Sequence, residues 1–254
     1  MPRILILGGT TEARILAGRL ASRPELDVTT SLAGRTASPA PQPVPVRVGG
    51  FGGREGLADY LRREGIDALI DATHPYAAVI SANALAAARD AAVPVVVLRR
   101  PPWTAVAGDC WTLVDGVADA IAALGEAPRC VLVTLGRGEL DPLVAAPQHH
   151  YLIRSVDPVE PPLAVPHAKY LTGRGPFAEA DERALLTAHG IECIIAKNSG
   201  GTATYGKIAA ARALGLSVIM LRRPTVPAAA AVDSVEDALA WLDHALAPAA
   251  ARGV

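Results

Sequence analysis

Short runs of branched apolar residues alternate along this chain with longer stretches of helical periodicity. The apolar runs predict strands at residues 4–7, 27–31, 44–48, 66–71, 93–98, 193–196 and 218–221. The periodic stretches predict helices at residues 12–21, 54–64, 78–91, 114–124, 208–212 and 232–246. Strands that alternate with helices pair in parallel, because each helix returns the chain to the edge where the previous strand began. The predicted fold class is therefore α/β with mainly parallel sheets.

The second half of the sequence repeats the pattern of the first half. Residues 85–101 contain Leu-Ala-Ala-Ala-Arg, an apolar run and then Arg-Arg-Pro. Residues 208–224 contain Ile-Ala-Ala-Ala-Arg, an apolar run and Arg-Arg-Pro at the same spacing. Residues 131–137 likewise echo the opening residues 4–10. A repeat that holds over several elements in one order predicts two similar domains.

The length of 254 residues is sufficient for two small domains. We expect a first domain over residues 1–110 and a second domain over residues 111–254, with the boundary within residues 101–127. The helices predicted at residues 114–124 and 232–246 could pack on either domain.

The bulk composition excludes several functions. The net charge is −1, so the chain has no general field for nucleic acid or for an anionic membrane. The cysteines Cys110, Cys130 and Cys193 lack metal-ligand spacing and are expected to be reduced thiols. No basic N-terminal region precedes a long apolar segment. We therefore expect a soluble, cytoplasmic protein that binds no metal, nucleic acid or membrane.

The opening strand leads into a glycine turn. Gly8, Gly9, Thr10, Thr11 and Glu12 follow the strand and lead into the predicted helix. Glycines permit a sharp turn, and the N–H groups at a helix N-terminus bind phosphate. The stretch is not the G-x-G-x-x-G pattern of dinucleotide sites. Two interpretations remain open, a nucleotide phosphate site and a tight structural turn.

The end of the second predicted strand bears on the choice of nucleotide. Folds that bind NAD through the ribose 2′-hydroxyl place an acidic residue there. This chain has Ser31, followed by Arg35, with no carboxylate between them. A hydroxyl and a guanidinium suit a 2′-phosphate, so the sequence predicts NADPH rather than NADH. An ordinary exposed loop position is the alternative for Arg35.

A donor-rich loop follows the strand predicted at residues 66–71. It contains Thr73, His74, Pro75 and Tyr76. Ligands in parallel sheets lie beyond the carboxyl ends of strands, so this loop would suit a wall against a nicotinamide or its ribose. A structural role is the alternative for a lone loop histidine.

The corresponding loop of the second half is also rich in donors. It consists of Lys197, Asn198, Ser199, Gly200 and Gly201. Amide and hydroxyl donors beside glycines favour contact with an anion or a substrate, and a helix cap is the alternative.

Further cations occur in the second half of the chain. If several converge, they would suit a substrate that carries many carboxylates. These residues are Arg137, Arg154, Arg174 and Lys207. A hydrolase has little support, because the chain has no Gly-x-Ser-x-Gly elbow and no recognisable Cys–His arrangement.

Five motifs in this order resemble the precorrin-6A reductase family of cobalamin biosynthesis. They lie at residues 8–13, 31–35, 71–77, 173–177 and 197–201, with Lys207 following the last motif. The resemblance extends from residue 3 to about residue 224 and is weakest over residues 135–143. It implies two Rossmann-like domains with a cleft between them. It also implies an NADPH-dependent reduction of one carbon–carbon double bond in precorrin-6A, with hydride to C19 and a proton to C18, giving precorrin-6B.

The resemblance further implies roles for individual residues. The implied cofactor contacts are Gly8, Gly9, Thr10, Thr11, Glu12, Ser31, Arg35, Thr73, His74 and Pro75. The implied contacts to the tetrapyrrole are Arg137, Arg154, Lys197, Asn198, Ser199, Gly200, Gly201 and Lys207, of which Arg137 lies in the weakly matching segment. Lys197, His74 and Tyr76 are the candidate proton donors, with solvent as a further source.

Two other functions remain open. A cobalt-precorrin-6A reductase would make nearly the same contacts to its macrocycle. A two-lobed small-molecule binding module without turnover would have similar halves but would gain nothing from an NADPH site. The expected partner is a small tetrapyrrole substrate, with transient contact to neighbouring pathway enzymes as a further possibility.

Overall fold

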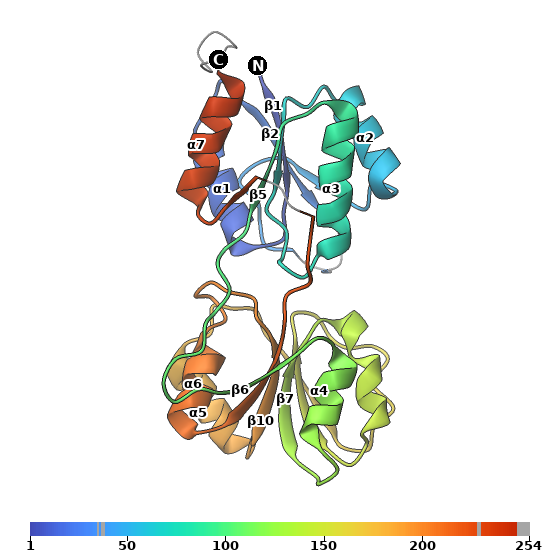
Figure 1. The fold of residues 1–254 in the computed structure, drawn as a ribbon, viewed down its shortest axis with the longest axis vertical. Coiled ribbons are helices and arrows are strands. Elements are labelled where there is room, and N and C mark those ends of the chain that lie inside the picture. Colours follow the sequence, from blue (N-terminus) through green and yellow to red (C-terminus); the bar gives the residue numbers. More distant parts are fainter. Residues whose placement is uncertain (35, 37–38, 228–229, 248–254) are drawn as a thin grey trace. The chain divides into compact units, whose positions relative to one another are not determined.

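The computed structural model describes residues 1–34, 36, 39–227 and 230–247, and it divides into two compact units (Figure 1). The first unit comprises Met1–Pro101 together with Pro224–Val254, and the second comprises Pro102–Arg223. Each unit is built on a six-stranded sheet in which every strand pair of the described residues is parallel. The predicted α/β class with parallel sheets is confirmed.

The first unit has the strand order β12-β5-β4-β1-β2-β3. Helices α1 and α7 pack on one face of this sheet, and α2 and α3 pack on the other. The strands are β1 (Arg3–Leu7), β2 (Asp27–Leu32), β3 (Val46–Val48), β4 (Ala68–Asp71), β5 (Val95–Leu98) and β12 (Ala231–Val232). The helices are α1 (Thr11–Ala21), α2 (Gly53–Arg63), α3 (Ala78–Ala91) and α7 (Val235–Leu246).

The second unit has the equivalent order β6-β11-β10-β7-β8-β9. Its strands are β6 (Cys110–Val114), β7 (Cys130–Thr134), β8 (His150–Ser155), β9 (Ala168–Thr172), β10 (Cys193–Lys197) and β11 (Ser217–Leu221). Its helices are α4 (Val117–Leu124), α5 (Glu179–Ala188) and α6 (Gly206–Leu214), with short 3₁₀ turns η1 (Arg137–Glu139) and η2 (Asp141–Ala145). No helix within the described parts of either unit is long and apolar enough to cross a membrane.

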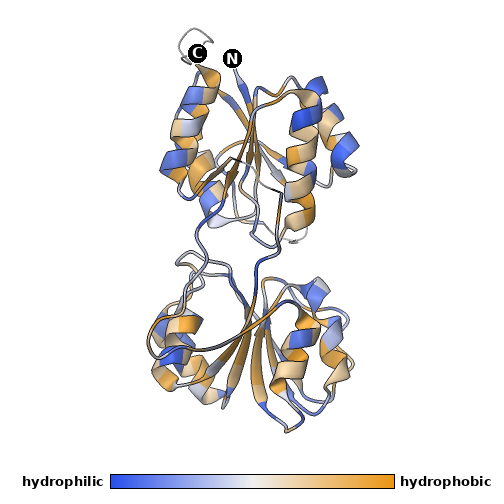
Figure 2. Ribbon diagram, viewed as in Figure 1, coloured by the Kyte–Doolittle hydropathy of each residue, from blue (hydrophilic) through white to orange (hydrophobic). Residues whose placement is uncertain are grey.

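The continuous apolar run of β1 is explained by helices that cover both faces of the sheet. Ile4 and Ile6 lie in the core beneath α1 and α7, whereas Leu5 and Leu7 lie in the core beneath α2 and α3. Successive side chains of a strand point to opposite faces, so a strand covered by helices on both sides needs apolar residues at every position. The central strands of both units are accordingly hydrophobic along their length (Figure 2).

The chain crosses between the units twice, and this corrects the expected domain limits. After β5, the first Arg-Arg-Pro segment leads to β6 and α4, which belong to the second unit. After β11, the second Arg-Arg-Pro segment leads to β12 and α7, which belong to the first unit. The expected second domain over residues 111–254 therefore differs from the observed unit, because the apolar face of α7 completes the core of the first unit.

Strands β6, β8, β9 and β12 and helix α5 were not predicted. The helix predicted from residue 114 begins at Val117, and Val114 instead ends β6. Strands β6 and β9 are the edges of their sheet, and nearly all of their residues are exposed or only partly buried, so they lack a continuous buried run. Strand β8 has an apolar centre, but a histidine and an arginine interrupt the pattern near its two ends.

The packing of α7 leads to a first prediction. Leu242 is fully buried in the core of the first unit, so Leu242→Ala should reduce its free energy of unfolding by about 3 kcal/mol. Peptide-resolved hydrogen exchange should show faster exchange in Met1–Pro101. The control Leu186→Ala, in α5, should accelerate exchange in Pro102–Arg223 instead. Faster exchange of Pro102–Arg223 in Leu242→Ala, with Met1–Pro101 unchanged, would contradict the grouping.

His149 is one of the buried polar residues of the second unit. Its side chain is fully buried, and neither ring nitrogen makes a hydrogen bond of normal geometry with a described residue, although the backbone of Gly125 opposes part of the pKa shift. Its ring lies edge-on to Tyr151, with 6.0 Å between ring centres. Burial lowers the pKa of His149 below its ordinary value of 6.5, so the folded protein holds this ring neutral.

A second prediction concerns acid stability. The unfolded chain protonates His149 near pH 6.5, whereas the folded chain does so only at lower pH. The stability associated with the neutral ring is therefore complete above that pH and decreases as the pH falls below it. We expect His149→Phe to lose less stability than the wild type between about pH 7.5 and about pH 5.5, measured by urea unfolding. His150→Phe, at an exposed ring, is the control, and parallel losses in wild type and His149→Phe would refute the prediction.

Candidate functional site

The carboxyl end of β1 can only be built with glycines. A Cβ atom on Gly8 would lie 2.8 Å from Cγ2 of Thr30 on the neighbouring strand, which is closer than such contacts allow. Gly9 has φ of 116°, a conformation that side chains disfavour. The backbone here can therefore approach a ligand with no side chain in between.

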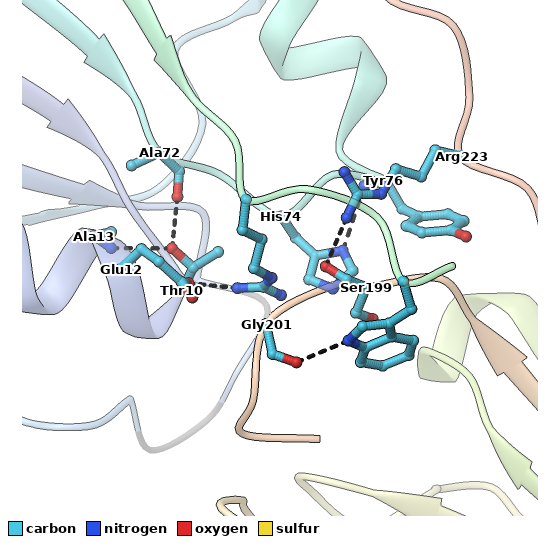
Figure 3. Close-up of polar contacts among 11 residues, drawn as sticks. Thr10, Glu12, Ala13, Ala72, His74, Tyr76, Ser199, Gly201 and Arg223 are labelled. Carbon is cyan, nitrogen blue, oxygen red and sulfur yellow. Dashed lines mark hydrogen bonds and ion pairs between the residues drawn. The ribbon is translucent and has the colours of Figure 1, made fainter. Parts of the chain in front are cut away.

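Thr10 fixes the start of α1 beside this turn. Its hydroxyl oxygen accepts a hydrogen bond from the N–H of Ala13 at 3.1 Å and donates to the carbonyl of Ala72 at 2.8 Å (Figure 3). The threonine thus caps α1 and connects the helix to the segment after β4. The first N–H groups of α1 have no partner within the helix and carry partial positive charge, which is the geometry that binds phosphate.

Glu12 places a carboxylate in the first turn of α1, where it would repel a phosphate. Arg100, which follows β5, forms an ion pair with Glu12, and the two side chains are 15% and 25% exposed. The pair neutralises the carboxylate and brings a guanidinium to the same edge. Sequence reasoning missed Arg100 as a site residue, although its position two residues after a strand was a usable signal.

Ser31 lies at the carboxyl end of β2 and is buried. Its hydroxyl is 3.4 Å from Nη1 of Arg47, the residue paired with it in the register of β2 and β3. Arg35, the predicted partner of Ser31, lies outside the described residues. Arg47 is a second site residue that sequence reasoning missed.

The loop after β4 is held by Asp71. Its Oδ1 accepts hydrogen bonds from the backbone N–H of Thr73 at 3.1 Å and from the Thr73 hydroxyl at 2.6 Å. Nδ1 of His74 accepts the backbone N–H of Tyr76 at 3.3 Å, so a neutral ring carries its proton on Nε2. The rings of His74 and Tyr76 are 5.6 Å apart, and Pro75 between them is buried. The loop is therefore ordered at the same edge as the glycine turn.

The equivalent strand end of the second unit has a different chemistry. After β7 the chain forms η1 rather than an α-helix, and Oε2 of Glu139 accepts the N–H of Gly136 at 3.0 Å. The same carboxylate forms an ion pair with Lys197, at the end of β10. Glu139 therefore supplies a negative charge from within the protein at this strand end. Arg137 is exposed and pairs with Asp157 at 3.7 Å.

Two other predicted contacts lie in a buried cluster. Both Nη atoms of Arg154 donate to the carboxylate of Glu182, and both side chains are almost fully buried. Lys207 donates to the carbonyl of Thr204 at 2.8 Å and is 4% exposed. Burial, together with the smaller effect of the Arg154 charge, lowers the pKa of Lys207 to about 7, although the carboxylate of Glu182 opposes this shift. The polar groups of Arg154 and Lys207 thus have partners within the protein.

Asn198 is engaged by a residue that sequence reasoning missed. Its Oδ1 accepts the backbone N–H of Trp103 at 2.7 Å, and its Nδ2 donates to the Trp103 carbonyl at 2.8 Å. The indole N–H of Trp103 donates to the carbonyl of Gly201 at 2.8 Å (Figure 3). Arg223 donates to the Ser199 carbonyl at 3.1 Å. The loop after β10, including Gly200 with φ of 67°, is therefore tied to the segment that enters the second unit.

The structure thus gathers the predicted residues in two groups. In the first unit, the glycine turn, Ser31 and the loop after β4 follow the carboxyl ends of neighbouring strands. In the second unit, Lys197 and its loop lie at the equivalent edge, whereas Arg154 and Lys207 are buried. Arg174 is exposed. These features define a Rossmann-like α/β protein whose first unit has a glycine turn at the N-terminus of a capped helix.

Comparison with known proteins identifies the family. The chain belongs to the precorrin-6x reductase CbiJ/CobK family, whose model matches residues 3–243. A protein named precorrin-6A reductase from Sinorhizobium sp is 56% identical over 98% of this chain and 95% of its own length. A protein named cobalt-precorrin-6A reductase from Priestia megaterium is 30% identical over 88% of this chain and 91% of its own length. A solved structure named CobK precorrin-6A reductase is 48% identical and superposes with a TM-score of 0.93, covering 97% of this chain and 98% of its own.

The buried cluster leads to a third prediction. Glu182→Gln would leave Arg154 as a buried cation without its carboxylate, so the free energy of unfolding should fall by about 3 kcal/mol. Adding Lys207→Met should recover part of this loss, because it removes the positive charge that Lys207 still carries beside Arg154. Urea unfolding measures both effects. Glu179→Gln, on the exposed side of the same helix, is the control and should change little. If Glu182→Gln unfolded at the wild-type urea concentration, the cluster would not have the electrostatic role described.

Proposed function

We propose that this protein is an NADPH-dependent oxidoreductase that reduces one carbon–carbon double bond of precorrin-6A to give precorrin-6B in cobalamin biosynthesis. In this reaction hydride goes to C19 and a proton goes to C18. The observation that carries the proposal is the glycine turn and capped helix of the first unit, beside a strand that ends in Ser31 rather than a carboxylate, in a member of this family.

The first unit is the side that we assign to the cofactor. The fit rests on the chain itself: Gly8 and Gly9 leave room for a close backbone approach, and Thr10 directs the N-terminus of α1 to that place. Arg100 offsets the charge of Glu12, which would otherwise oppose a pyrophosphate. When bound, NADPH supplies the hydride. The residues of the first unit then have the task of holding and orienting it, with Thr73–Pro75 as the wall beside the nicotinamide.

The second unit is the side that we assign to the tetrapyrrole. Lys197 and Ser199 lie at the carboxyl edge of its sheet, in a loop stabilised by the Asn198–Trp103 contacts. Lys197 is paired with Glu139, so an acetate or propionate group of the macrocycle would bind it by replacing or sharing that carboxylate. Reduction builds charge on the macrocycle, and a donor such as Lys197, His74 or Tyr76 would stabilise or protonate it.

A specific observation favours the metal-free substrate over the cobalt form. The relatives named precorrin-6A reductase are 43–56% identical to this chain, whereas those named cobalt-precorrin-6A reductase are 29–30% identical. The likeness to the first group extends over at least 95% of the chain. The cobalt enzyme is therefore the second candidate, and a binding module without turnover is the third.

A fourth prediction tests the proposed reaction. Anaerobic incubation of the pure protein with NADPH and precorrin-6A should oxidise one NADPH for each precorrin-6B formed, followed by the nicotinamide absorbance. With NADPH deuterated on the transferable hydrogen, the product should carry deuterium at C19. In deuterated water with ordinary NADPH, the product should carry deuterium at C18.

The controls separate the three candidates. NADH in place of NADPH should react more slowly, because it lacks the 2′-phosphate. Turnover of cobalt-precorrin-6A alone would support the second candidate instead. Binding of NADPH and precorrin-6A without oxidation of the cofactor would support the binding module.

A further inference from the structure

Arg47 lies where the ribose end of a dinucleotide would meet the first sheet. It is the central residue of β3, and it pairs in register with Ser31 on β2. Its Nη1 is 3.4 Å from the Ser31 hydroxyl. In Rossmann-like sheets the end of this second strand contacts the adenine ribose. A guanidinium therefore stands beside the residue expected to distinguish the two nicotinamide cofactors.

The guanidinium of Arg47 is held rigidly before any ligand arrives. Its Cζ lies 3.8 Å from the ring centre of Phe51 and 5.2 Å from that of Tyr60, and the two rings pack edge to face. Nη1 donates to the carbonyl of Gly49 at 2.5 Å, and Nη2 donates to the carbonyl of Gly50 at 2.8 Å. Preorganisation of this kind reduces the entropy lost when a donor binds a ligand.

The positive charge of Arg47 has no counter-charge in the described part of the chain. Its partners are two neutral carbonyls and a hydroxyl, and no described carboxylate pairs with it. Arg54, which follows closely, instead binds both oxygens of Asp90. Nε of Arg47 and one N–H of Nη2 have no acceptor among the described residues, so a pair of donors remains for a planar acceptor such as phosphate.

We propose that Arg47 is a specificity-determining residue that contacts the 2′-phosphate of NADPH together with Ser31. The inference rests on the proposed use of NADPH and deepens it. Phosphate would supply the negative charge that the surroundings of Arg47 lack. The competing role is a purely structural one, in which Arg47 only holds the loop at Gly49 and Gly50. The two roles differ in whether NADPH and NADH are affected alike.

A fifth prediction separates these roles. Arg47→Met keeps an apolar side chain against the Phe51 ring but removes the charge and the donors. We expect its dissociation constant for NADPH to rise by ~10-fold or more, with that for NADH within ~2-fold of the wild type, because only NADPH has the phosphate. Arg47→Lys should give an intermediate loss, since it keeps the charge without the planar fork. Titration calorimetry on the full-length protein measures each constant.

The control is Arg63→Met. Arg63 lies 5.5 Å from the ring of Tyr60 and pairs with Glu64, so its loss tests the packing of that ring without removing Arg47. It should leave both dissociation constants unchanged. Competition by 2′,5′-ADP and by 5′-ADP provides a second readout. Arg47→Met should weaken the binding of 2′,5′-ADP and leave that of 5′-ADP unchanged. Urea unfolding of each variant checks that the first unit is folded.

The outcomes distinguish this inference from the proposed function. Suppose that the wild type prefers NADPH, but Arg47→Met and Arg47→Lys weaken the binding of NADPH and NADH equally or leave both unchanged. Arg47 would then have a structural role only, and the inference would be overturned. The proposed function would then stand. If the wild type bound neither cofactor, the proposed function would fail, and the inference with it.

Discussion

Parallel strand pairing is the constraint on which the rest of this structure depends. In a parallel sheet all strands end at one edge, so segments distant in sequence meet there. The register of the first sheet aligns Leu7 with Ser31 on one side and with Asp71 on the other. Backbone pairing therefore brings the glycine turn, Ser31 and the loop after β4 to one edge of the sheet. The side chains decide only what that edge can bind.

A parallel sheet also needs helices on both faces, and here the cover comes from both ends of the chain. In the first unit α1 is adjacent to β1 in sequence, but α7 reaches the same face only after the chain has built the second unit. Without Ala238 and Leu242 that face would lack part of its core. The first unit is thus built from two separate segments of the chain, whereas the second unit is one continuous segment. The stability of the first unit therefore depends on a helix that is distant in sequence from most of that unit.

Features that depend on residues close in sequence could be predicted, whereas features that depend on residues distant in sequence could not. Most central strands and all helices except α5 could be predicted, because buried runs and helical periodicity are local. The helix at Ala78–Ala91 was predicted with its observed limits. The unit on which α7 packs could not be predicted, because the apolar face of an amphipathic helix does not identify the surface that it contacts. The pairs Arg100–Glu12, Arg154–Glu182 and Trp103–Asn198 join residues 28 to 95 positions apart. They depend on strand order and loop path, which no local pattern contains.

The two units show how one repeated pattern can reach different chemistry. Both have a central strand followed by a glycine, but in the second unit Pro142 lies shortly after the turn, and two 3₁₀ turns replace the helix that the first unit forms. A helix N-terminus collects several unpaired N–H groups, which a short 3₁₀ turn does not. The N–H of Gly136 is already bonded to Glu139, and the same carboxylate pairs with Lys197. An incoming phosphate would have to displace this internal anion, whereas Gly8 and Gly9 precede a capped helix. The difference between the two repeats therefore supports our proposal of a nucleotide phosphate in the first unit and of the loop after β10 as the substrate contact of the second unit.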